Sequence, residues 1–288
     1  MTLLETKNLT HVYGAGTPFE RSAICNVNFT ASKGECIGII GATGSGKSTF
    51  VQHLNGLLKP TSGQVYYEGN DIHGSRDFTR QIRFKIGLVF QYPEYQLFES
   101  TVFNDIAFGP KNMGLSDSEV RERVFEAAGF VRLDESILEK SPFELSGGQK
   151  RRAAIAGVMA MMPEVLILDE PTAGLDPRGR DNILHNIMGY KEAIDATLII
   201  VTHNMDEIVR TATQVYLFDK GNIVENGTPA MVFSDIARLH ELGLAAPKMT
   251  MVAARLRALG LDIPGDILTI TQLHKALSKL RAEGVTTC

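Results

Sequence analysis

A glycine-rich stretch holds the residues of this chain that are best suited to chemistry on phosphate groups. It fits the pattern G-x-x-x-x-G-K-[ST] and consists of Gly41, Ala42, Thr43, Gly44, Ser45, Gly46, Lys47, Ser48 and Thr49. Glycines let successive backbone N–H groups turn toward one phosphate at the positive end of a helix. Lys47 can then reach the β- and γ-phosphates of a nucleotide, and the Ser48 hydroxyl can ligate Mg²⁺. The stretch therefore predicts a nucleotide site with a bound magnesium ion.

The segments on either side of this loop supply the structure that such a site requires. Residues 36–40 are apolar and predict a buried strand, and residues 49–57 can begin a helix. A glycine-rich turn that binds nothing is the alternative interpretation. The strand, the helix and the adjacent lysine and serine together favour phosphate binding.

Five more short motifs follow, each next to an apolar run or a helix start. They are Gln91, residues 145–149 (Leu-Ser-Gly-Gly-Gln), Asp169 with Glu170, residues 173–176 (Ala-Gly-Leu-Asp) and His203. Any one of them is a weak signal, but their joint order and spacing leave little room for chance. Over about residues 3–230 the chain resembles the ATP-binding cassette ATPases, in which these segments are the Walker A loop, Q-loop, signature, Walker B strand, D-loop and H-switch.

The apolar pattern predicts which parts of the chain form sheets. Residues 36–40, 165–169 and 198–202 are almost continuously apolar, which is typical of parallel strands buried on both faces. Each leads into a motif, and an open α/β sheet binds ligands at the carboxyl ends of its strands. Residues 23–29 and 63–68 alternate instead and predict antiparallel strands. The expected fold is an α/β P-loop NTPase cassette with an antiparallel β subdomain and a mostly parallel core sheet.

Helical patterns occupy the middle and the end of the chain. An α-helical signature subdomain is expected over about residues 92–162, with a capping-box helix from Ser116 to about Ala128 and a second helix from Ser146 to Met161. We assign residues 1–230 to the cassette and residues 231–288 to a C-terminal helical tail. The last helix should bury one face, because apolar residues recur there at helical spacing, namely at Ile270, Leu273, Leu277 and Leu280.

Catalysis of phosphoryl transfer to water depends chiefly on positioning and charge stabilisation. Ser48 and Asp169 are the expected Mg²⁺ ligands, and Gln91 can contact both the metal and the attacking water. Glu170 ends a buried strand beside the expected γ-phosphate and is the candidate general base; the alternative is an acid at a helix N-terminus. His203 can bond the γ-phosphate, although a lone histidine after a strand is usually structural.

The signature segment has the composition of an anion site at a helix start. Its residues are Ser146, Gly147, Gly148 and Gln149. The resemblance implies that they close over ATP bound by a second cassette, and that Asp176 crosses the interface between the two chains. An ordinary capped turn is the alternative. The basic run at residues 150–152 should form an exposed cluster near that interface.

Tyr13 precedes the glycine-rich loop by about thirty residues and lies in a β-rich segment. The resemblance implies that its ring stacks on the adenine of ATP. A tyrosine in the core or on the surface is the alternative interpretation, and Phe19 is a second candidate for stacking.

Composition excludes several other functions. The 288 residues carry a net charge of −4, so no basic field would recruit nucleic acid. The longest apolar run, residues 153–162, is shorter than the about 20 residues that cross a bilayer. The three cysteines, Cys25, Cys36 and Cys288, lack metal or redox spacing, and Met1 starts no recognisable signal peptide. We expect a peripheral protein at the cytoplasmic face of the membrane.

The region after Gln91 indicates which group of cassette ATPases the chain resembles. Residues 91–98, 101–102 and 105–110 resemble the ATP-binding subunits of energy-coupling factor transporters, including the cobalt-importer type. Residues 16–20 and 110–112 are more similar to the second of the two paralogous ATPases than to the first. This implies an ATP-hydrolysing motor that drives uptake of a vitamin or metal ion. Its partners would be a second, paralogous cassette, an integral membrane coupling subunit docked near residues 91–110, and through these a substrate-binding membrane protein. The alternative is a cytosolic regulatory ATPase without a membrane partner.

Overall fold

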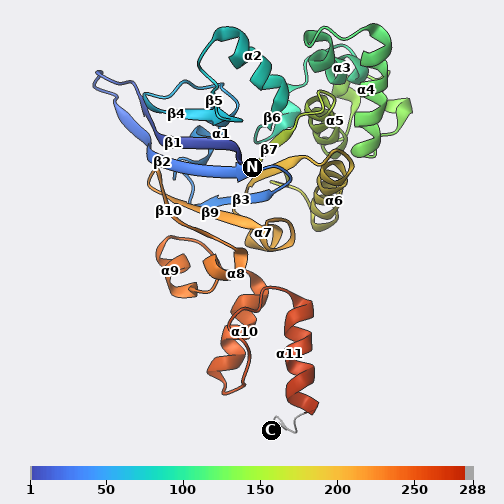
Figure 1. Cartoon of the computed structure of the whole chain (residues 1–288). Helices are drawn as coiled ribbons and strands as arrows, with labels where there is room; N and C mark the ends of the chain where they lie inside the picture. Colours follow the sequence, from blue (N-terminus) through green and yellow to red (C-terminus); the bar gives the residue numbers. More distant parts are fainter. Residues whose placement is uncertain (1, 283–288) are drawn as a thin grey trace.

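The computed structural model describes residues 2–282, which form two sheets and three groups of helices (Figure 1). The first sheet is antiparallel throughout and has the order β2-β1-β4-β5. Its strands are β1 (Thr2–Tyr13), β2 (Arg21–Ser32), β4 (Ser62–Tyr67) and β5 (Asn70–Asp71). This confirms the prediction of antiparallel strands in the first seventy residues.

The second sheet has the order β10-β9-β3-β8-β7-β6 and is parallel except for its β10 edge. Its strands are β3 (Cys36–Gly41), β6 (Ile86–Val89), β7 (Val165–Asp169), β8 (Thr197–Val201), β9 (Gln214–Asp219) and β10 (Asn222–Gly227). Every residue of β3, β7 and β8 is buried, as predicted. Asp169 pairs with Val201 and Val201 with Ile39, so the three strands end together and present their following residues at one edge.

Two apolar layers cover the faces of this core sheet. On one face, helix α1 (Lys47–Leu54) lies between the two sheets, with Phe50 packed among Ile37, Ile167 and Ile199. On the other face, helix α6 (Pro177–Ile194) contributes to a cluster that also contains alternate residues of β7 and β8. The sheet thereby fixes the orientation of the two helices that follow the phosphate loop and the D-loop.

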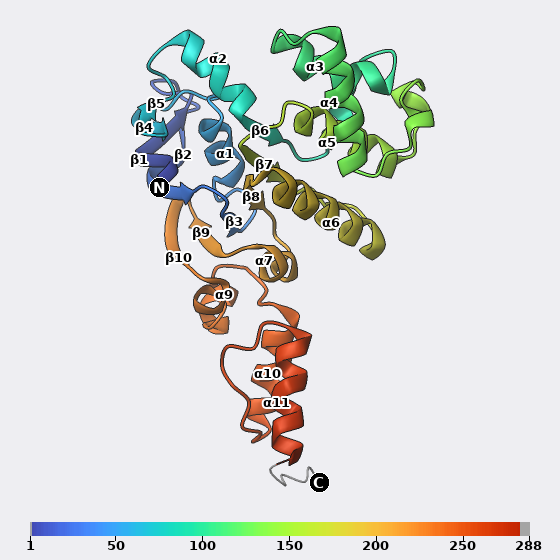
Figure 2. The ribbon, with the colours of Figure 1, turned by 45° about the vertical axis from the view of Figure 1, so that its right-hand side comes forward.

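The helical arm lies beside the core sheet (Figure 2). It comprises α3 (Val102–Asn112), α4 (Asp117–Phe130) and α5 (Gly147–Met159), with short 3₁₀ segments at Pro93–Gln96, Glu135–Ile137 and Pro142–Glu144. The predicted capping box at Ser116 is present. Helix α5 ends two residues earlier than predicted, and α1 spans Lys47–Leu54 rather than residues 49–57. Helices α2 (Arg76–Lys85) and α7 (Met205–Thr211) flank the core.

The last four helices lead away from the cassette (Figures 1 and 2). They are α8 (Pro229–Val232), α9 (Ile236–Glu241), α10 (Lys248–Ala258) and α11 (Ile270–Ala282). Leu273 is buried and Leu280 packs beside it in a small cluster with α10. However, Ile270 is 71% exposed and Leu277 is 38% exposed. The predicted four-residue buried face is therefore wrong for these two, because the side of α11 that packs against α10 carries Leu273 and Leu280. Cys288 lies outside the described residues.

Candidate active site

The phosphate loop, residues 41–49, connects the end of β3 to the start of α1, and its glycines are required by its shape. Gly41, Gly44 and Gly46 have φ angles of 153°, 79° and 104°, which non-glycine residues rarely adopt. A Cβ on Gly41 would lie 2.3 Å from the Phe218 carbonyl oxygen. The loop is also tied to the β9–β10 turn, because the Gly221 N–H donates to the Ser45 carbonyl at 2.9 Å. The sequence thus encodes a narrow backbone cradle at the positive end of α1.

Lys47 places its ammonium group inside this cradle. The Nζ atom donates to the carbonyl oxygens of Gly41 and Ala42 at 2.7 and 2.9 Å, and to the Ser45 hydroxyl at 3.4 Å. Burial lowers the pKa of Lys47, and the nearby carboxylates Glu170 and Asp169 oppose that shift. Because the ammonium group already lies in the loop, it can exchange these protein oxygens for the phosphate oxygens of a ligand without a large movement of the chain.

Asp169 and Ser48 meet where β7 ends beside α1. Burial raises the pKa of Asp169, while a hydrogen bond from the Ser48 hydroxyl opposes the rise. A carboxylate next to a hydroxyl fits Mg²⁺, which takes one or two carboxylates and completes its shell with waters and phosphates. Gln91 is exposed two residues after β6, whose Val89 pairs with Leu168. It therefore lies at the same edge of the sheet.

Glu170 has the most constrained environment of the predicted catalytic residues. Its φ angle is 51°, and its backbone N–H donates to the Val201 carbonyl at 2.8 Å. One carboxylate oxygen, Oε1, accepts from His203 Nδ1 at 2.8 Å. The other, Oε2, is buried and has no partner within the described chain. Glu170 is not at a helix N-terminus, since α6 begins at Pro177. A left-handed backbone at a non-glycine residue costs about 1 kcal/mol or more, and such strain recurs at functional sites.

The signature and D-loop residues both cap helices. Ser146 accepts from the Gln149 N–H and forms a complete capping box at the start of α5. Side chains added at Gly147 or Gly148 would meet no heavy atom of the described chain within 4 Å, so this helix start is open to a ligand. Asp176 accepts from the Gly179 N–H at 2.7 Å and is the N-cap of α6. The alternative interpretation, an ordinary capped turn, therefore describes the hydrogen bonds at these helix starts. It does not exclude a contact between the signature segment and a phosphate.

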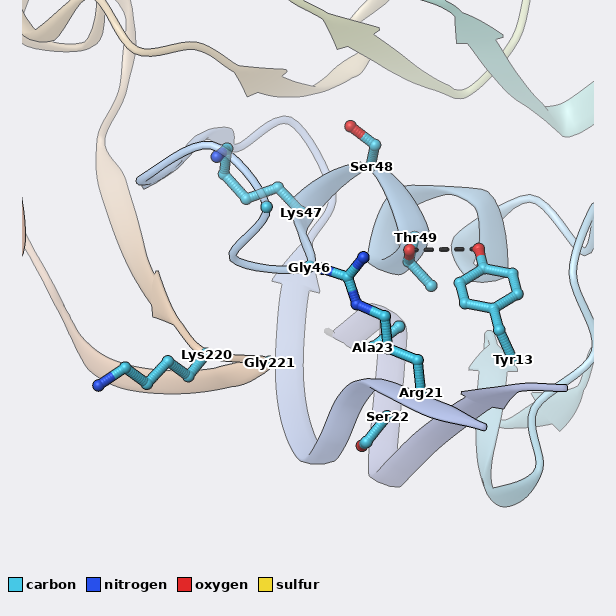
Figure 3. Close-up of a pocket in the computed structure, with 11 residues that line it drawn as sticks. Tyr13, Arg21, Ser22, Ala23, Gly46, Lys47, Ser48, Thr49, Lys220 and Gly221 are labelled. Carbon is cyan, nitrogen blue, oxygen red and sulfur yellow. Dashed lines mark hydrogen bonds between the residues drawn. The ribbon is translucent and has the colours of Figure 1, made fainter. Parts of the chain in front are cut away.

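The pocket in front of the loop has a volume of about 430 Å³ (Figure 3). Its walls come from β1, β2, the phosphate loop and the β9–β10 turn, and consist of Tyr13, Arg21, Ser22, Ala23, Gly44, Gly46, Lys47, Ser48, Thr49, Lys220 and Gly221. The Tyr13 hydroxyl lies 3.3 Å from Thr49 Oγ1, whereas Phe19 is 87% exposed and is not among these walls. No described residue of the helical arm reaches this pocket.

Arg151 is a residue whose position the sequence interpretation misjudged. It was expected in an exposed basic cluster, yet its side chain is only 4% exposed. Its Nε and Nη2 atoms donate to the Glu94 carboxylate at 3.1 and 2.8 Å, and Nη1 donates to the Ala173 carbonyl oxygen. The pair joins the segment after Gln91 to the start of α5 and to the D-loop. The sequence did contain a signal for this burial, because Arg151 is four residues before the core residue Ile155 and so lies on the same face of the helix.

Glu207 is a second buried charged residue that sequence reasoning did not single out. It is 3% exposed, and its carboxylate accepts from the Thr172 and Thr202 hydroxyls at 2.7 and 3.2 Å. It also accepts from the Asn204 amide at 3.0 Å. The segment after Glu170 and the residues on both sides of His203 are thereby fixed to one carboxylate.

Comparisons with known proteins agree with this geometry. The family model described as ABC transporter matches residues 24–173. The chain is 51% identical to the energy-coupling factor transporter ATP-binding protein EcfA2 of Caldanaerobacter subterraneus subsp. tengcongensis, over 93% of this chain and 94% of the relative. It is also 51% identical to EcfA2 of Clostridium tetani, over 99% of each chain.

Solved structures show the same likeness. That of cbiO1 from Clostridium perfringens, part of the ABC transporter complex cbiONQ, has a TM-score of 0.74 at 36% identity, over 90% of this chain and 98% of the other. The dimeric cassette MJ0796 bound to ADP and Pi has a TM-score of 0.71 at 29% identity, over 79% and 99%. The family predicted from the motifs is confirmed. The chain belongs to the ABC transporter ATPases and, within them, to the ATP-binding proteins of energy-coupling factor transporters, whose ATP hydrolysis is coupled to membrane transport.

Proposed function

We propose that ATP binds between the phosphate loop of this chain and the signature segment of a second, paralogous cassette. The observation that carries this proposal is the one-sided pocket. Lys47, Ser48 and Tyr13 surround it, while Ser146 and the open glycines after it lie in the helical arm and contribute nothing to it. A second cassette facing this one would supply the missing wall. The MJ0796 structure, a dimer bound to ADP and Pi, is a related arrangement in another protein.

Within that interface, Glu170 would take a proton from the attacking water as an oxygen–phosphorus bond forms to the γ-phosphorus and the bond to the ADP oxygen breaks. Its buried, unpartnered Oε2 is the acceptor suited to this step. His203 orients the same carboxylate through Oε1. Ser48, Asp169 and Gln91 would hold Mg²⁺, which supplies charge neutralisation for the transferred phosphoryl group. Lys47 would stabilise the same developing charge.

The membrane coupling subunit would dock in a groove between the helical arm and α2. This groove, of about 390 Å³, is lined by Arg83, Phe84, Gln96, Leu97, Phe98, Asp105, Phe108, Gly109, Asn112, Ala153, Ala154, Gly157, Val158 and Met161. Phe98 and Phe108 are 60% and 47% exposed and contact each other edge to face. Asp105 is buried, and its Oδ2 has no partner in the described chain. An apolar helix with one hydrogen-bond donor fits this groove.

An alternative role for Tyr95, Leu97 and Phe98 is to pack the arm against the core, and the burial of Leu97 alone supports it. Leu97 is partly buried against the large core cluster, whereas Tyr95 is 83% exposed. The exposed aromatic residues therefore favour a partner that covers them.

The transported substrate is proposed to be a vitamin or metal ion, captured by a substrate-binding membrane protein of the same complex, with this chain at the cytoplasmic face. The names of the energy-coupling factor relatives support the membrane transporter, and the substrate class is proposed from the resemblance of the sequence motifs. Among residues 2–282, no helix is long and apolar enough to cross a membrane, so the chain would reach the bilayer through a partner.

Co-purification tests this function and separates it from that of a cytosolic regulatory ATPase. The full chain is expressed with its paralogue and membrane subunits, and detergent-solubilised membranes are purified through a tag on this chain. We expect a complex with a hydrophobic subunit whose ATPase activity is lost in Glu170→Gln. Recovery of an active ATPase from the soluble fraction alone would contradict the transporter assignment.

A further inference from the structure

Two histidines lie directly behind the wall of the nucleotide pocket that carries Tyr13. His11 shares a face of β1 with Tyr13, since side chains two residues apart on a strand point the same way. The two rings contact each other edge to face with centroids 4.5 Å apart. His53 lies on α1 and is fully buried. Neither residue lines the pocket itself, and no step described above uses them.

The strand and the helix are joined by two side-chain contacts of matching spacing. Tyr13 meets Thr49, and His11 Nδ1 lies 3.1 Å from His53 Nε2. Two residues of a strand span about 6.6 Å, and four residues of a helix rise about 6 Å. The positions 11 and 13 on β1 therefore align with positions 53 and 49 on α1, and the two contacts form a short ladder between them.

Backbone carbonyl groups determine which ring nitrogens carry protons. His53 Nδ1 lies 2.8 Å from the Thr49 carbonyl oxygen, which can only accept, so this nitrogen donates and Nε2 accepts. His11 Nδ1 lies 3.2 Å from the Lys59 carbonyl oxygen and must also carry a proton. This single proton is shared between the Lys59 carbonyl oxygen and His53 Nε2, which lie 3.2 and 3.1 Å from His11 Nδ1. Burial lowers the pKa of His53 to about 4, so the ring stays neutral and can accept this bond at physiological pH.

We propose that His11 and His53 are positioning residues for nucleotide recognition, because they fix the Tyr13 ring at a set distance from the phosphate loop. Helix α1 begins with Lys47 and Ser48, so the ladder connects the aromatic wall to the element that holds the phosphates. A ligand with both a base and a triphosphate benefits from this fixed distance, whereas a triphosphate without a base does not. The inference rests on the proposed stacking of adenine on Tyr13.

The test compares two magnesium-bound ligands, ATP and inorganic tripolyphosphate, by calorimetric titration of the full chain. His11→Phe keeps a ring against Tyr13 but removes the donor, while His11→Asn keeps a donor in the place of Nδ1. His11 is only partly buried, which makes these variants safer than changes at His53. His185→Phe on the exposed face of α6 is the matched control.

We expect His11→Phe to weaken ATP binding by about threefold or more, as for the loss of one hydrogen bond, and to leave tripolyphosphate binding unchanged. His11→Asn and His185→Phe should bind both ligands like the parent chain. Tyr13→Ala should weaken ATP binding by about tenfold through lost stacking, and adding His11→Phe to it should have no further effect.

Each contrary result has a distinct meaning. If His11→Phe binds ATP normally while Tyr13→Ala does not, the ladder has no positioning role. If His11→Phe weakens both ligands equally, it only supports the phosphate loop, and the inference is wrong. If Tyr13→Ala itself binds ATP normally, the proposed adenine stacking fails first and the ladder has nothing to position.

Discussion

The phosphate-loop side of the molecule and the arm-and-tail side differ in which side chains they bury and which they expose. Around the loop, charged groups are buried and already paired within the chain: Lys47 with loop carbonyls, Asp169 with Ser48, and Glu170 with His203. On the arm and tail, apolar groups such as Phe98 and Ile270 are exposed. The first surface is organised before any ligand arrives, because an unpaired buried charge would cost several kcal/mol. The second becomes buried only when another protein covers it.

Removing the loop cation should have the largest effect. Lys47→Ala deletes the ammonium that lies among Gly41, Ala42 and Ser45, so we expect loss of hydrolysis and at least a hundredfold weaker ATP binding, a few kcal/mol. Calorimetry and phosphate-release assays measure the two quantities. Turnover close to that of the parent chain in the assembled complex would show that the loop does not hold the reacting phosphates.

Glu170→Gln should separate binding from chemistry. The amide cannot accept a proton, so we expect hydrolysis to fall by about 10³-fold with ATP affinity nearly unchanged. The ATP-bound dimer should then accumulate, and size-exclusion chromatography with light scattering measures it. A variant that hydrolyses ATP at the parent rate would exclude Glu170 as the base. His203→Ala removes the partner of Oε1 and the expected bond to the γ-phosphate but keeps the Glu170 carboxylate, so it is expected to retain more activity.

Arg151 tests the boundary between the two sides, because it is a buried charge located in the arm. Arg151→Met leaves the Glu94 carboxylate, 18% exposed, without its partner, and should lower the free energy of unfolding by about 3 kcal/mol. Lys150→Met, next to it and partly exposed, should change stability by about 0.5 kcal/mol. Urea denaturation compares them. Equal free energies of unfolding for the two variants would mean that the ion pair does not stabilise the fold.

These residues also show what could be predicted from the sequence. The phosphate loop and the strands ending at Asp169 and Val201 were predictable, since their chemistry depends on neighbours in the chain and on apolar runs. The Arg151–Glu94 pair and the His11–His53 contact were not, because they join residues 57 and 42 positions apart. Such pairs depend on how the elements pack. The exposure of Ile270 was missed for the same reason, since helical spacing alone does not say how many neighbours a helix has.

The groove should determine assembly without affecting the nucleotide site. Phe98→Asp places a charge among exposed aromatic groups, so we expect about tenfold weaker association with the membrane subunit and unchanged ATP binding by the isolated chain. Leu97→Asp is a poor probe, because Leu97 packs against the core cluster and its loss should destabilise the fold. Co-purification and calorimetry separate the two variants. Normal recovery of the membrane subunit with Phe98→Asp would place its docking surface elsewhere.

The tail should give the smallest effect, and the structure indicates where to cut it. Leu244 and Ala246 are buried in a cluster with Ile40 and Ile208 of the core, so deleting residues 240–288 would expose apolar surface of the cassette itself. Deleting residues 248–288 removes α10 and α11, whose apolar cluster is their own, and takes from the core-side cluster the partly buried Leu268.

We expect this shorter deletion to leave ATP binding intact and to weaken association with the second cassette by a few-fold. It removes the exposed Ile270 and Leu277, which would bury apolar surface in that association. Ile270→Lys should reproduce part of the effect without any deletion. Analytical ultracentrifugation of the mixed cassettes measures both. If the shortened chain associates as tightly as the full one, the exposed side of α11 does not contact the second cassette and has another partner. The contrast with the phosphate-loop side would then apply to the arm and not to the tail.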